Sequence, residues 1–221
     1  MLIRSSPFSI RVQAPLACFT RPELKTERVS YEVMTPSAAR GVFDAILWKP
    51  AIVWRIERIK VLAPIVFASI RRNEVNHKIS SDSAESWMKG TQRPEPYFAD
   101  DPSNRAQRHT LALRDVDYVI EAYFEMTDRR GADDNLQKFE EMFARRLAKG
   151  QCFHRPYLGC REFAADFGPA SGHPEPIPLT RELGRMLHDL DYRSGNRPHF
   201  FDARLVDGIL DVPPWRGAAA A

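Results

Sequence analysis

The feature that most constrains this fold is a strict two-residue alternation in VDYVIEAYFEM, residues 116–126. Apolar side chains hold every second position, namely Val116, Tyr118, Ile120, Ala122, Phe124 and Met126. Asp117, Glu121 and Glu125 stand on the opposite side. Because successive side chains of a β-strand point to opposite faces, the pattern predicts a strand with one apolar face. It is the clearest strand in the sequence, and any fold for the chain must contain it.

Two other regions have strand character. Apolar and polar residues alternate in FSIRV, residues 8–12, which predicts an opening strand. The segment 51–70, AIVWRIERIKVLAPIVFASI, is rich in β-branched and aromatic residues and has too many polar interruptions for a buried helix. It is interpreted as one long strand, or as two strands separated near Pro64.

A first helix is predicted after Thr35, whose side chain can cap it, with Pro36 in the first turn. Its apolar stripe comprises Val42, Phe43, Ile46 and Leu47. The helix should end at Lys49, because Pro50 disfavours a helical residue before it. A capped helix entered from a charged loop can hold an anion on the N–H groups of its first turn. The pattern alone favours the simpler alternative, a surface loop leading into a packing helix.

A second helix is predicted from about Asp133 to Lys149, with Gly150 as its stop. At about 100° per residue, two sets of side chains separate around it. Leu136, Phe139, Phe143 and Leu147 gather on one side, and Lys138, Met142, Arg145 and Lys149 on another. The first side is expected to pack, and the second offers a line of positive charge.

Residues 71–110 are different: they are polar, lack sustained periodicity and contain three prolines. We interpret them as a long loop, which in a compact domain is usually functional or disordered. After the second helix, PYLGCREFAADF, residues 156–167, is predicted to be a return strand.

The predicted order is strand, helix, strand, strand, helix, strand, which fits a ferredoxin-like split βαβ module. From about Glu175 onward two alternating segments surround Asp207-Gly208, a strong hairpin signal. The fold class predicted is therefore α+β, with a ferredoxin-like (RRM-like) N-terminal domain and a C-terminal antiparallel β-sheet lobe. Residues 1–170 would form the first domain, with 71–110 as an insertion, and residues 171–221 the second.

Charge and cysteine content narrow the classes of function. The net charge of +3 is too balanced to indicate nucleic-acid binding by itself, so a polyanion site must come from local clustering. Three cysteines without close pairs are typical of free thiols in a reducing compartment. No run approaches the roughly 18 apolar residues that span a bilayer. A cytoplasmic protein without a membrane partner is expected.

Catalytic motifs of the common kinds are missing. The sequence has no phosphate-binding glycine loop, no GxSxG elbow and no paired CxxC or HExxH spacing. Cys152, His154 and Cys160 share one loop, but their spacing is weak support for zinc, so no metal or cofactor is expected. The same loop carries His154, Arg155 and Tyr157, which could serve proton transfer on a phosphodiester.

Basic residues carry the argument for nucleic acid. They occur as the pairs Arg71-Arg72, Arg129-Arg130 and Arg145-Arg146, together with Arg28, Lys49 and Lys138. Each pair alone is most often a solvated surface. Several of them around a ferredoxin-like sheet would make a path for a phosphate backbone.

Four long segments resemble a known family. They are ACFTRPELKTERVSYEVMTPSAARGVFDAILWKP, IRRNEVNHK, VDYVIEAYFEMTD and GQCFHRPYLGCREF. They are similar to the CRISPR-associated Cas5 family of type I-C systems, in the repeat-associated RNA-binding superfamily, and the resemblance runs from about Phe8 to Pro213. It implies a repeat-specific, metal-independent endoribonuclease that processes precursor crRNA and stays on the 5′ handle within Cascade. The implied reaction is attack of a 2′-hydroxyl on the adjacent phosphorus, which leaves a 2′,3′-cyclic phosphate.

The resemblance transfers only part of the family's site. Members often have tyrosine or histidine just before Trp-Lys-Pro, where this chain has Leu47, and a Lys-His pair where it has Lys138-Phe139. The catalytic residues predicted are Lys138 with His154 and Tyr157 in place of the missing proton-transfer groups; Tyr31 and His77 are weaker choices. The predicted RNA-binding residues are Arg21, Lys25, Arg28, Lys49, Arg71, Arg72, Arg145 and Arg146.

Two functions remain open from the sequence. The first is the endoribonuclease, favoured by the extent of the resemblance and by Lys138. The second is a subunit that binds the 5′ handle and assembles with other type I-C Cascade subunits without efficient cutting, favoured by Leu47 and Phe139. Double-stranded DNA is a third candidate partner, which the basic clusters permit.

Overall fold

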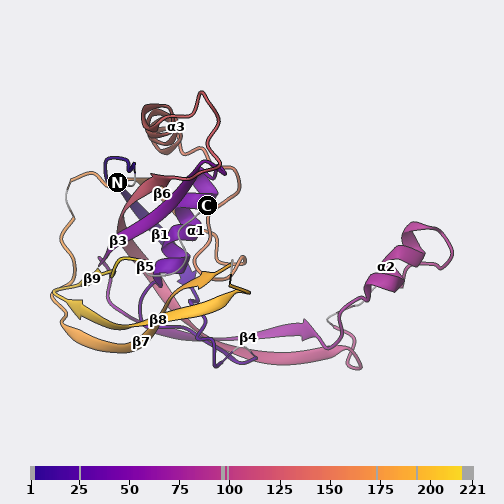
Figure 1. The fold of residues 1–221 in the computed structure, drawn as a ribbon. Coiled ribbons are helices and arrows are strands. Elements are labelled where there is room, and N and C mark those ends of the chain that lie inside the picture. The colour runs from indigo at the N-terminus through magenta and orange to yellow at the C-terminus, as the bar shows by residue number, and fades with distance from the viewer. Residues whose placement is uncertain are drawn as a thin grey trace.

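The computed structural model describes residues 3–24, 26–95, 98, 100–172, 174–192 and 194–215, and all structural statements concern these residues. The elements are, in order, β1 (Phe8–Ala17), β2 (Arg28–Val29), α1 (Pro36–Ile46), β3 (Ile52–Val61), β4 (Phe67–Val75), α2 (Ser81–Met88), β5 (Arg105–Met126), α3 (Leu136–Ala148), β6 (Asp166–Pro169), β7 (Arg181–Asp191), β8 (Arg197–Val206) and β9 (Ile209–Asp211). The fold is therefore α+β, mostly antiparallel sheet with three helices (Figure 1).

The sheet is organised around β5, the 22-residue strand that contains the alternating segment. Its main path runs β6-β1-β5-β3-β9-β8-β7, with β2 and β4 also paired to β5. Every pairing is antiparallel except the short β2–β5 pair. Ile120, Ala122 and Phe124 are completely buried, so the predicted apolar face of this strand is confirmed.

The core lies where α1 and α3 meet the sheet around Trp54 of β3. The Trp54 ring centroid is 4.7 Å from those of Phe43 on α1 and Phe143 on α3, and 5.2 Å from that of Phe124 on β5. Burial of a phenylalanine side chain of this kind contributes roughly 1.5–3 kcal/mol. The predicted apolar stripes of both helices therefore pack on the same cluster.

Helix α1 begins as predicted and ends earlier. Thr35 Oγ1 accepts a hydrogen bond from the Ala38 amide at 3.3 Å, and Pro36 is the first helical residue. Leu47 is already extended, with φ −147°, so the predicted end at Lys49 is wrong. The reason is tertiary: Trp54 Nε1 donates to the Leu47 carbonyl at 2.9 Å, which replaces a further helical turn.

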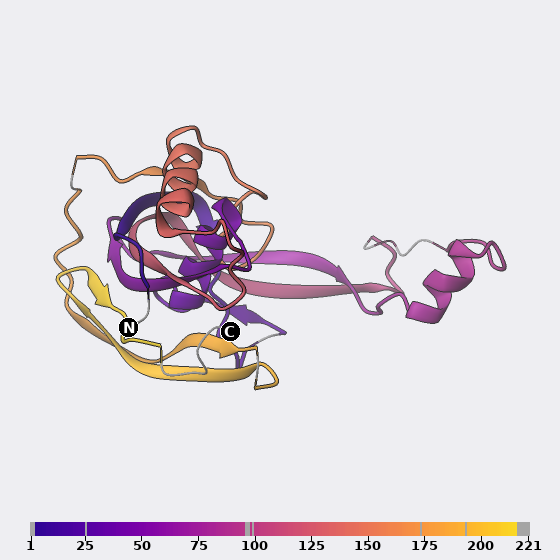
Figure 2. The same ribbon diagram turned by 45° about the horizontal axis from the view of Figure 1, so that its top comes forward.

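Residues 71–110 are not the loop that their composition predicts. β4 pairs with the first part of β5, with Arg71 opposite His109 and Val75 opposite Arg105. The two strands form an arm that extends away from the body and carries α2 near its end (Figures 1 and 2). Strand β4 has no buried residue. Because the ribbon needs no apolar face there, its sequence lacks the alternation that would have revealed it.

The predicted return strand at residues 156–167 is also largely wrong. Only β6, Asp166–Pro169, pairs with β1, and before it the chain makes an isolated bridge between Tyr157 and Ala164. The Cys18 amide donates to the Leu158 carbonyl at 3.0 Å. Gly159 has φ +84°, and a Cβ there would lie 1.9 Å from the Cys18 carbonyl oxygen. This close approach bends the segment into a loop.

The C-terminal strands are antiparallel, as predicted. Asp207 and Gly208 have φ values of 46° and 73°, which suit the tight turn between β8 and β9. Strand β9 pairs with β3, so β7, β8 and β9 continue the main sheet. No helix among the described residues is long and apolar enough to cross a bilayer.

Candidate active site

A cavity of about 470 Å³ brings together two of the three predicted catalytic residues. His154 and Tyr157 form one wall, from the loop that follows α3. Ser37, Ala38, Gly41 and Asp44 form the floor, while Phe19, Thr20, Leu187, Asp189, Leu190 and Tyr192 complete most of the boundary. The cavity therefore lies between α1, the end of β7 and the loop after α3.

The floor is one face of α1. Ala38, Gly41 and Asp44 follow each other at three-residue spacing, which places them on neighbouring positions of one helix face. The core stripe, with Val42, Phe43 and Ile46 buried, lies on another face. A Cβ added at Gly41 would meet nothing within 4 Å, so the floor is open at this point.

The last turn of α1 holds the His154 loop in place. The Phe153 and His154 amides both donate to the Ala45 carbonyl, at 2.8 and 3.4 Å. Arg146 Nη1 donates to the Ile46 carbonyl at 2.5 Å. Carbonyl groups at a helix end have no partner within the helix, and here Arg146 of α3 and the loop after α3 satisfy two of them. The contact positions His154 beside α1.

His154 and Tyr157 lie face to face. Their ring centroids are 6.3 Å apart with an interplanar angle of 25°. His154 is exposed and Tyr157 is half-buried, so the imidazole is open to a ligand in solution. The pair offers a proton acceptor and a proton donor at one wall, which is the chemistry predicted for this loop.

An arginine between two carboxylates sets the charge of the cavity. Arg40 Nε and Nη2 donate to Asp189 at 2.6 and 3.1 Å, and Arg40 Nη1 donates to Asp44 at 2.5 Å. Burial opposes the charge of Arg40, yet the hydrogen bond and charge of Asp189 raise its pKa above the ordinary value. Burial also raises the pKa of Asp44, against the opposing charge of Arg40. The ionised cluster has one more negative than positive charge.

The cluster of Arg40, Asp44 and Asp189 was not predicted from the sequence, and only part of it could have been. Arg40 and Asp44 are four residues apart, which is the usual spacing of an ion pair on a helix, so this pair could have been predicted from the sequence. Asp189 is 149 residues from Arg40, and nothing local in the sequence brings them together.

Lys138, the third predicted catalytic residue, lies elsewhere. Its Nζ donates to Asp134 Oδ1 at 2.8 Å, at the start of α3. The hydrogen bond from Lys138 lowers the pKa of Asp134, and the charge of Lys49 acts in the same direction. Among the described residues, no hydrogen bond or ion pair joins Lys138 to His154 or Tyr157. Lys138 precedes Arg146 by eight residues, or about 12 Å along the helix.

Leu47 and Phe139, the two positions at which the resemblance predicts proton-transfer residues, are in the core. Leu47 is completely buried and Phe139 is 2% exposed. Of the weaker candidates, Tyr31 is buried, with its hydroxyl accepting from the Leu187 amide at 3.3 Å, and His77 is exposed beyond β4 on the arm.

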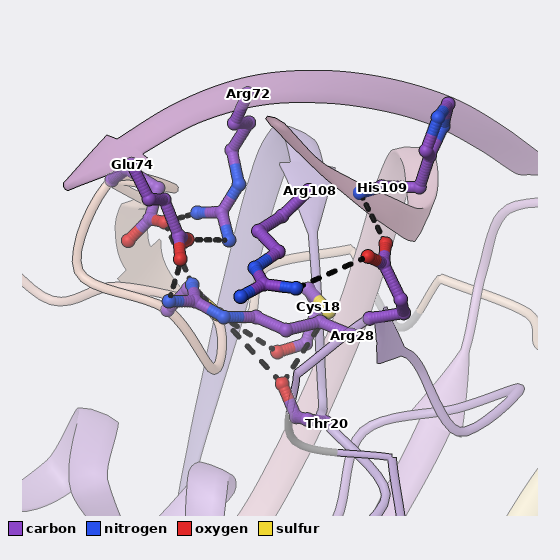
Figure 3. A network of polar contacts seen from close by, with 10 residues as sticks. Cys18, Thr20, Arg28, Arg72, Glu74, Arg108 and His109 are labelled. Carbon is purple, nitrogen blue, oxygen red and sulfur yellow. Dashed lines mark hydrogen bonds and ion pairs between the residues drawn. The ribbon is translucent and has the colours of Figure 1, made fainter. Parts of the chain in front are cut away.

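Two of the predicted RNA-binding arginines, Arg28 and Arg72, share the same two carboxylates (Figure 3). Arg28 contacts Glu162 at 3.0 Å and Glu74 at 3.4 Å, and Arg72 contacts the same two glutamates. A phosphate would have to compete with these glutamates for both guanidinium groups.

The other predicted RNA-binding residues have different surroundings. Arg21 stacks over Tyr31 at 4.6 Å and forms an ion pair with Glu23 at 3.8 Å. Arg146 caps α1. Arg71 and Arg145 are exposed, without an ion pair among the described residues, and Lys49 is half-buried. Lys25 lies outside the described residues.

All three cysteines are free thiols, and two of them meet next to Arg28. Cys160 Sγ lies 3.6 Å from the Cys18 carbonyl, and Arg28 Nη1 donates to Cys160 Sγ at 3.5 Å. Hydrogen bonds from Cys18 and Thr20, with the charge of Arg28, lower the pKa of Cys160 to about 6. No group of three or more His, Cys, Asp or Glu residues suited to a metal occurs in the part of the chain that the structure describes.

Comparison with known proteins gives consistent matches. The family model Cas_Cas5d, described as CRISPR-associated protein (Cas_Cas5), matches residues 9–217. A Mannheimia succiniciproducens protein named CRISPR pre-crRNA endoribonuclease Cas5d is 49% identical over 93% of this chain and 94% of its own. A Thermus thermophilus protein of the same name is 41% identical over 92% and 90%. A solved structure of a CRISPR-associated protein has TM-score 0.71 at 22% identity, over 97% of this chain and 95% of its own, and shares the fold.

Proposed function

The chain belongs to the CRISPR-associated Cas5 family, of the Cas5d kind, and we propose that it is a pre-crRNA endoribonuclease. The observation that carries the proposal is the relative from Mannheimia succiniciproducens, which has this name and matches the chain over almost its whole length. The second relative carries the same name. The site adds a proton acceptor and donor, His154 and Tyr157, on the wall of an accessible cavity.

The proposed reaction is an internal transesterification of RNA. His154 takes the proton of a ribose 2′-hydroxyl, and the 2′-oxygen forms a bond to the adjacent phosphorus. The bond from phosphorus to the 5′-oxygen breaks, and Tyr157 gives its proton to that oxygen. The products are a 2′,3′-cyclic phosphate and a 5′-hydroxyl. General acid–base catalysis of this kind contributes about 10²–10⁴-fold to the rate.

Lys138 is proposed to hold the RNA backbone next to the scissile phosphate. The Lys138 ammonium is exposed and its partner Asp134 is a surface carboxylate, so a phosphate can displace that carboxylate at little cost. Lys49 lies close enough to add a second positive charge. Because Lys138 does not line the cavity, proton transfer is assigned to His154 and Tyr157 alone.

The test is cleavage of the repeat RNA by the purified protein in EDTA. We expect the wild-type protein to cut, and His154→Ala to cut at least about 100-fold more slowly with RNA affinity retained. Lys138→Ala should weaken binding and cleavage together. Cleavage by His154→Ala at the wild-type rate would remove His154 from the mechanism, and absence of cutting by the wild type would contradict the enzyme.

A second candidate function is binding and assembly without efficient cutting. It is favoured by the burial of Leu47 and Phe139, which removes both of the family's proton-transfer positions. In either case we propose that the partners are the repeat hairpin with its 5′ handle and the other type I-C Cascade subunits, in the cytoplasm where the precursor is made. Double-stranded DNA remains a candidate partner for Arg71 and Arg145.

The strand order supports a ferredoxin-like domain. We infer that residues 1–170 form it, with 71–110 as an insertion, and that residues 171–221 form a second, β-sheet domain. The supporting observation is the order β6-β1-β5-β3, with α1 connecting β1 to β3 and α3 connecting β5 to β6. This is the arrangement of a split βαβ module.

A further inference from the structure

The charge of the cavity next to His154 suits a ligand other than phosphate. Arg40 donates through Nε, Nη1 and Nη2 to Asp44 and Asp189, so each of its nitrogens already has a carboxylate partner. The ionised cluster has two negative charges and one positive charge, which disfavours a phosphate in contact with Asp44 or Asp189. The scissile phosphate of the proposed reaction would lie at the exposed His154 and not on this cluster. The cluster favours a neutral group that brings N–H donors.

One carboxylate oxygen in the cavity is available to such a donor. Both oxygens of Asp189 accept hydrogen bonds from Arg40, and the Leu190 amide also donates to Oδ1 at 2.8 Å. Asp44 accepts from Arg40 only at Oδ2, and its Oδ1 has no hydrogen-bond partner among the described residues. The Asp44 side chain is 23% exposed, so a ligand can reach it. Arg40 meanwhile holds the carboxylate in one orientation.

The size and walls of the cavity suit a nucleobase. Its volume of about 470 Å³ lies in the range of small-molecule sites. His154 and Tyr157 stand on one wall, and Tyr192, 64% exposed, on another. Unpaired RNA bases are bound by stacking on such rings and by hydrogen bonds to their Watson–Crick edges.

Among the four RNA bases, guanine fits Asp44 best, because Oδ1 has no partner among the described residues and Oδ2, which accepts from Arg40, keeps a second lone pair. Its Watson–Crick edge presents two neighbouring donors, the N1–H and the 2-amino group. Adenine and cytosine present one amino group beside an acceptor, and uracil one N–H between two carbonyls. We propose that this cavity binds the Watson–Crick edge of an unpaired guanine of the RNA, with Asp44 as the acceptor and Tyr192 as the stacking surface. The inference rests on the proposed function, since it supposes an RNA substrate.

The first experiment measures binding of 5′-GMP, 5′-IMP, 5′-AMP, 5′-CMP and 5′-UMP to the full chain by calorimetry. IMP lacks only the 2-amino group, so GMP should bind about tenfold tighter than IMP and than the other three. Asp44→Asn should remove this preference. Equal or undetectable binding of all five nucleotides would overturn the inference, as would an unchanged preference in Asp44→Asn.

Gly41 provides a matched pair of variants that leave the charges untouched. Gly41→Leu puts a large side chain into the open floor and should abolish GMP binding, whereas Gly41→Ala should retain most of it. Both replace glycine within a helix by a better helix former, so neither is expected to unfold the protein. Full GMP binding by Gly41→Leu would place the nucleotide outside this cavity and overturn the proposal.

An experiment with inosine-substituted RNA distinguishes failure of the guanine site from failure of the proposed endoribonuclease. Repeat RNA with inosine in place of each unpaired guanine should reveal one position where wild-type affinity falls about tenfold and Asp44→Asn affinity does not. If wild-type protein cuts the repeat RNA but discriminates at no guanine, only the cavity assignment is wrong. If it shows the guanine preference but cuts no RNA, the guanine site stands and the endoribonuclease proposal fails.

Discussion

Leu47 stands where the resemblance predicts a tyrosine or histidine, and its surroundings show why it is apolar. The side chain is completely buried next to Trp54, and the Trp54 indole donates to the Leu47 carbonyl. A tyrosine or histidine at this position would have to place a polar group in the core or turn outward. The residue therefore stabilises the end of α1.

Replacement of Leu47 by alanine should lower the free energy of unfolding by about 2–5 kcal/mol, because it leaves a cavity in the core. Urea denaturation followed by tryptophan fluorescence measures the change. Its neighbour Trp48 is 60% exposed, so Trp48→Ala serves as the control and should change stability by less than about 0.5 kcal/mol. A fully stable Leu47→Ala protein that no longer cuts RNA would instead show a direct role in the reaction.

Cys160 should be the most reactive thiol of the pair next to Arg28. Its pKa is lowered to about 6, while the hydrogen bond to Cys160 and burial raise the pKa of Cys18. Alkylation of Cys160 by iodoacetamide should therefore be nearly pH-independent above pH 7 and should slow as the pH falls through about 6, since only the thiolate reacts. Mass spectrometry of the peptide that contains Cys160 gives the rate.

Arg28→Gln tests one contribution to that reactivity, the charge of Arg28, beside the larger effect of the hydrogen bond from Cys18. Without the guanidinium, the pKa of Cys160 should rise and its alkylation at pH 7 should slow. An alkylation profile centred near the ordinary thiol pKa of about 8.5 in the wild-type protein would contradict the geometry around Cys160.

At the scale of elements, α1 has two functions on two faces. One face packs on Trp54, and the other is the floor of the cavity. Its apolar stripe was predictable from residues 42–47, because core packing imposes a local period. Its early end and the pairing of its charged face with Asp189 were not, because both depend on tertiary contacts, with Trp54, Arg146 and Asp189.

Arg145 and Arg146 are adjacent on α3 but should behave differently. Arg146 donates to the Ile46 carbonyl, so Arg146→Ala should lower the free energy of unfolding by about 1–3 kcal/mol. Arg145 is exposed, so Arg145→Ala should leave stability unchanged and weaken binding of repeat RNA, with a smaller salt dependence. Urea denaturation and fluorescence anisotropy, applied to both variants, distinguish the two roles. Identical behaviour of the pair would show that the contact between α3 and α1 does not stabilise the fold.

At the scale of the whole molecule, β5 joins the arm to the body. Its second half was predicted from its alternation, whereas its first half, paired with β4 on the arm, was not, because that part has no large core to cover. The β3–β9 pairing was also missed, since a register such as Ile59 opposite Leu210 joins segments about 150 residues apart. Patterns that arise from burial are visible in a sequence, and patterns that arise from distant pairing are not.

The same distinction applies to the site. His154 and Tyr157 were predicted together because they share one short loop, and the structure places both on the cavity. Lys138 was assigned to the same site by resemblance, and it lies at the start of α3 next to Asp134. Asp44 and Arg40 were overlooked because their significance depends on Asp189. Only the fold brings Asp189 to Arg40 and Asp44.

The central claim, that this chain cuts RNA through an attacking 2′-hydroxyl without a metal, can be tested with one pair of substrates. Purified protein in EDTA is incubated with the repeat RNA and with the same RNA carrying a single 2′-deoxy nucleotide at the cut, and the products are separated on a denaturing gel. We expect cleavage of the first substrate alone, with a 2′,3′-cyclic phosphate on the upstream product. Cleavage of both substrates, or of neither, would contradict the claim.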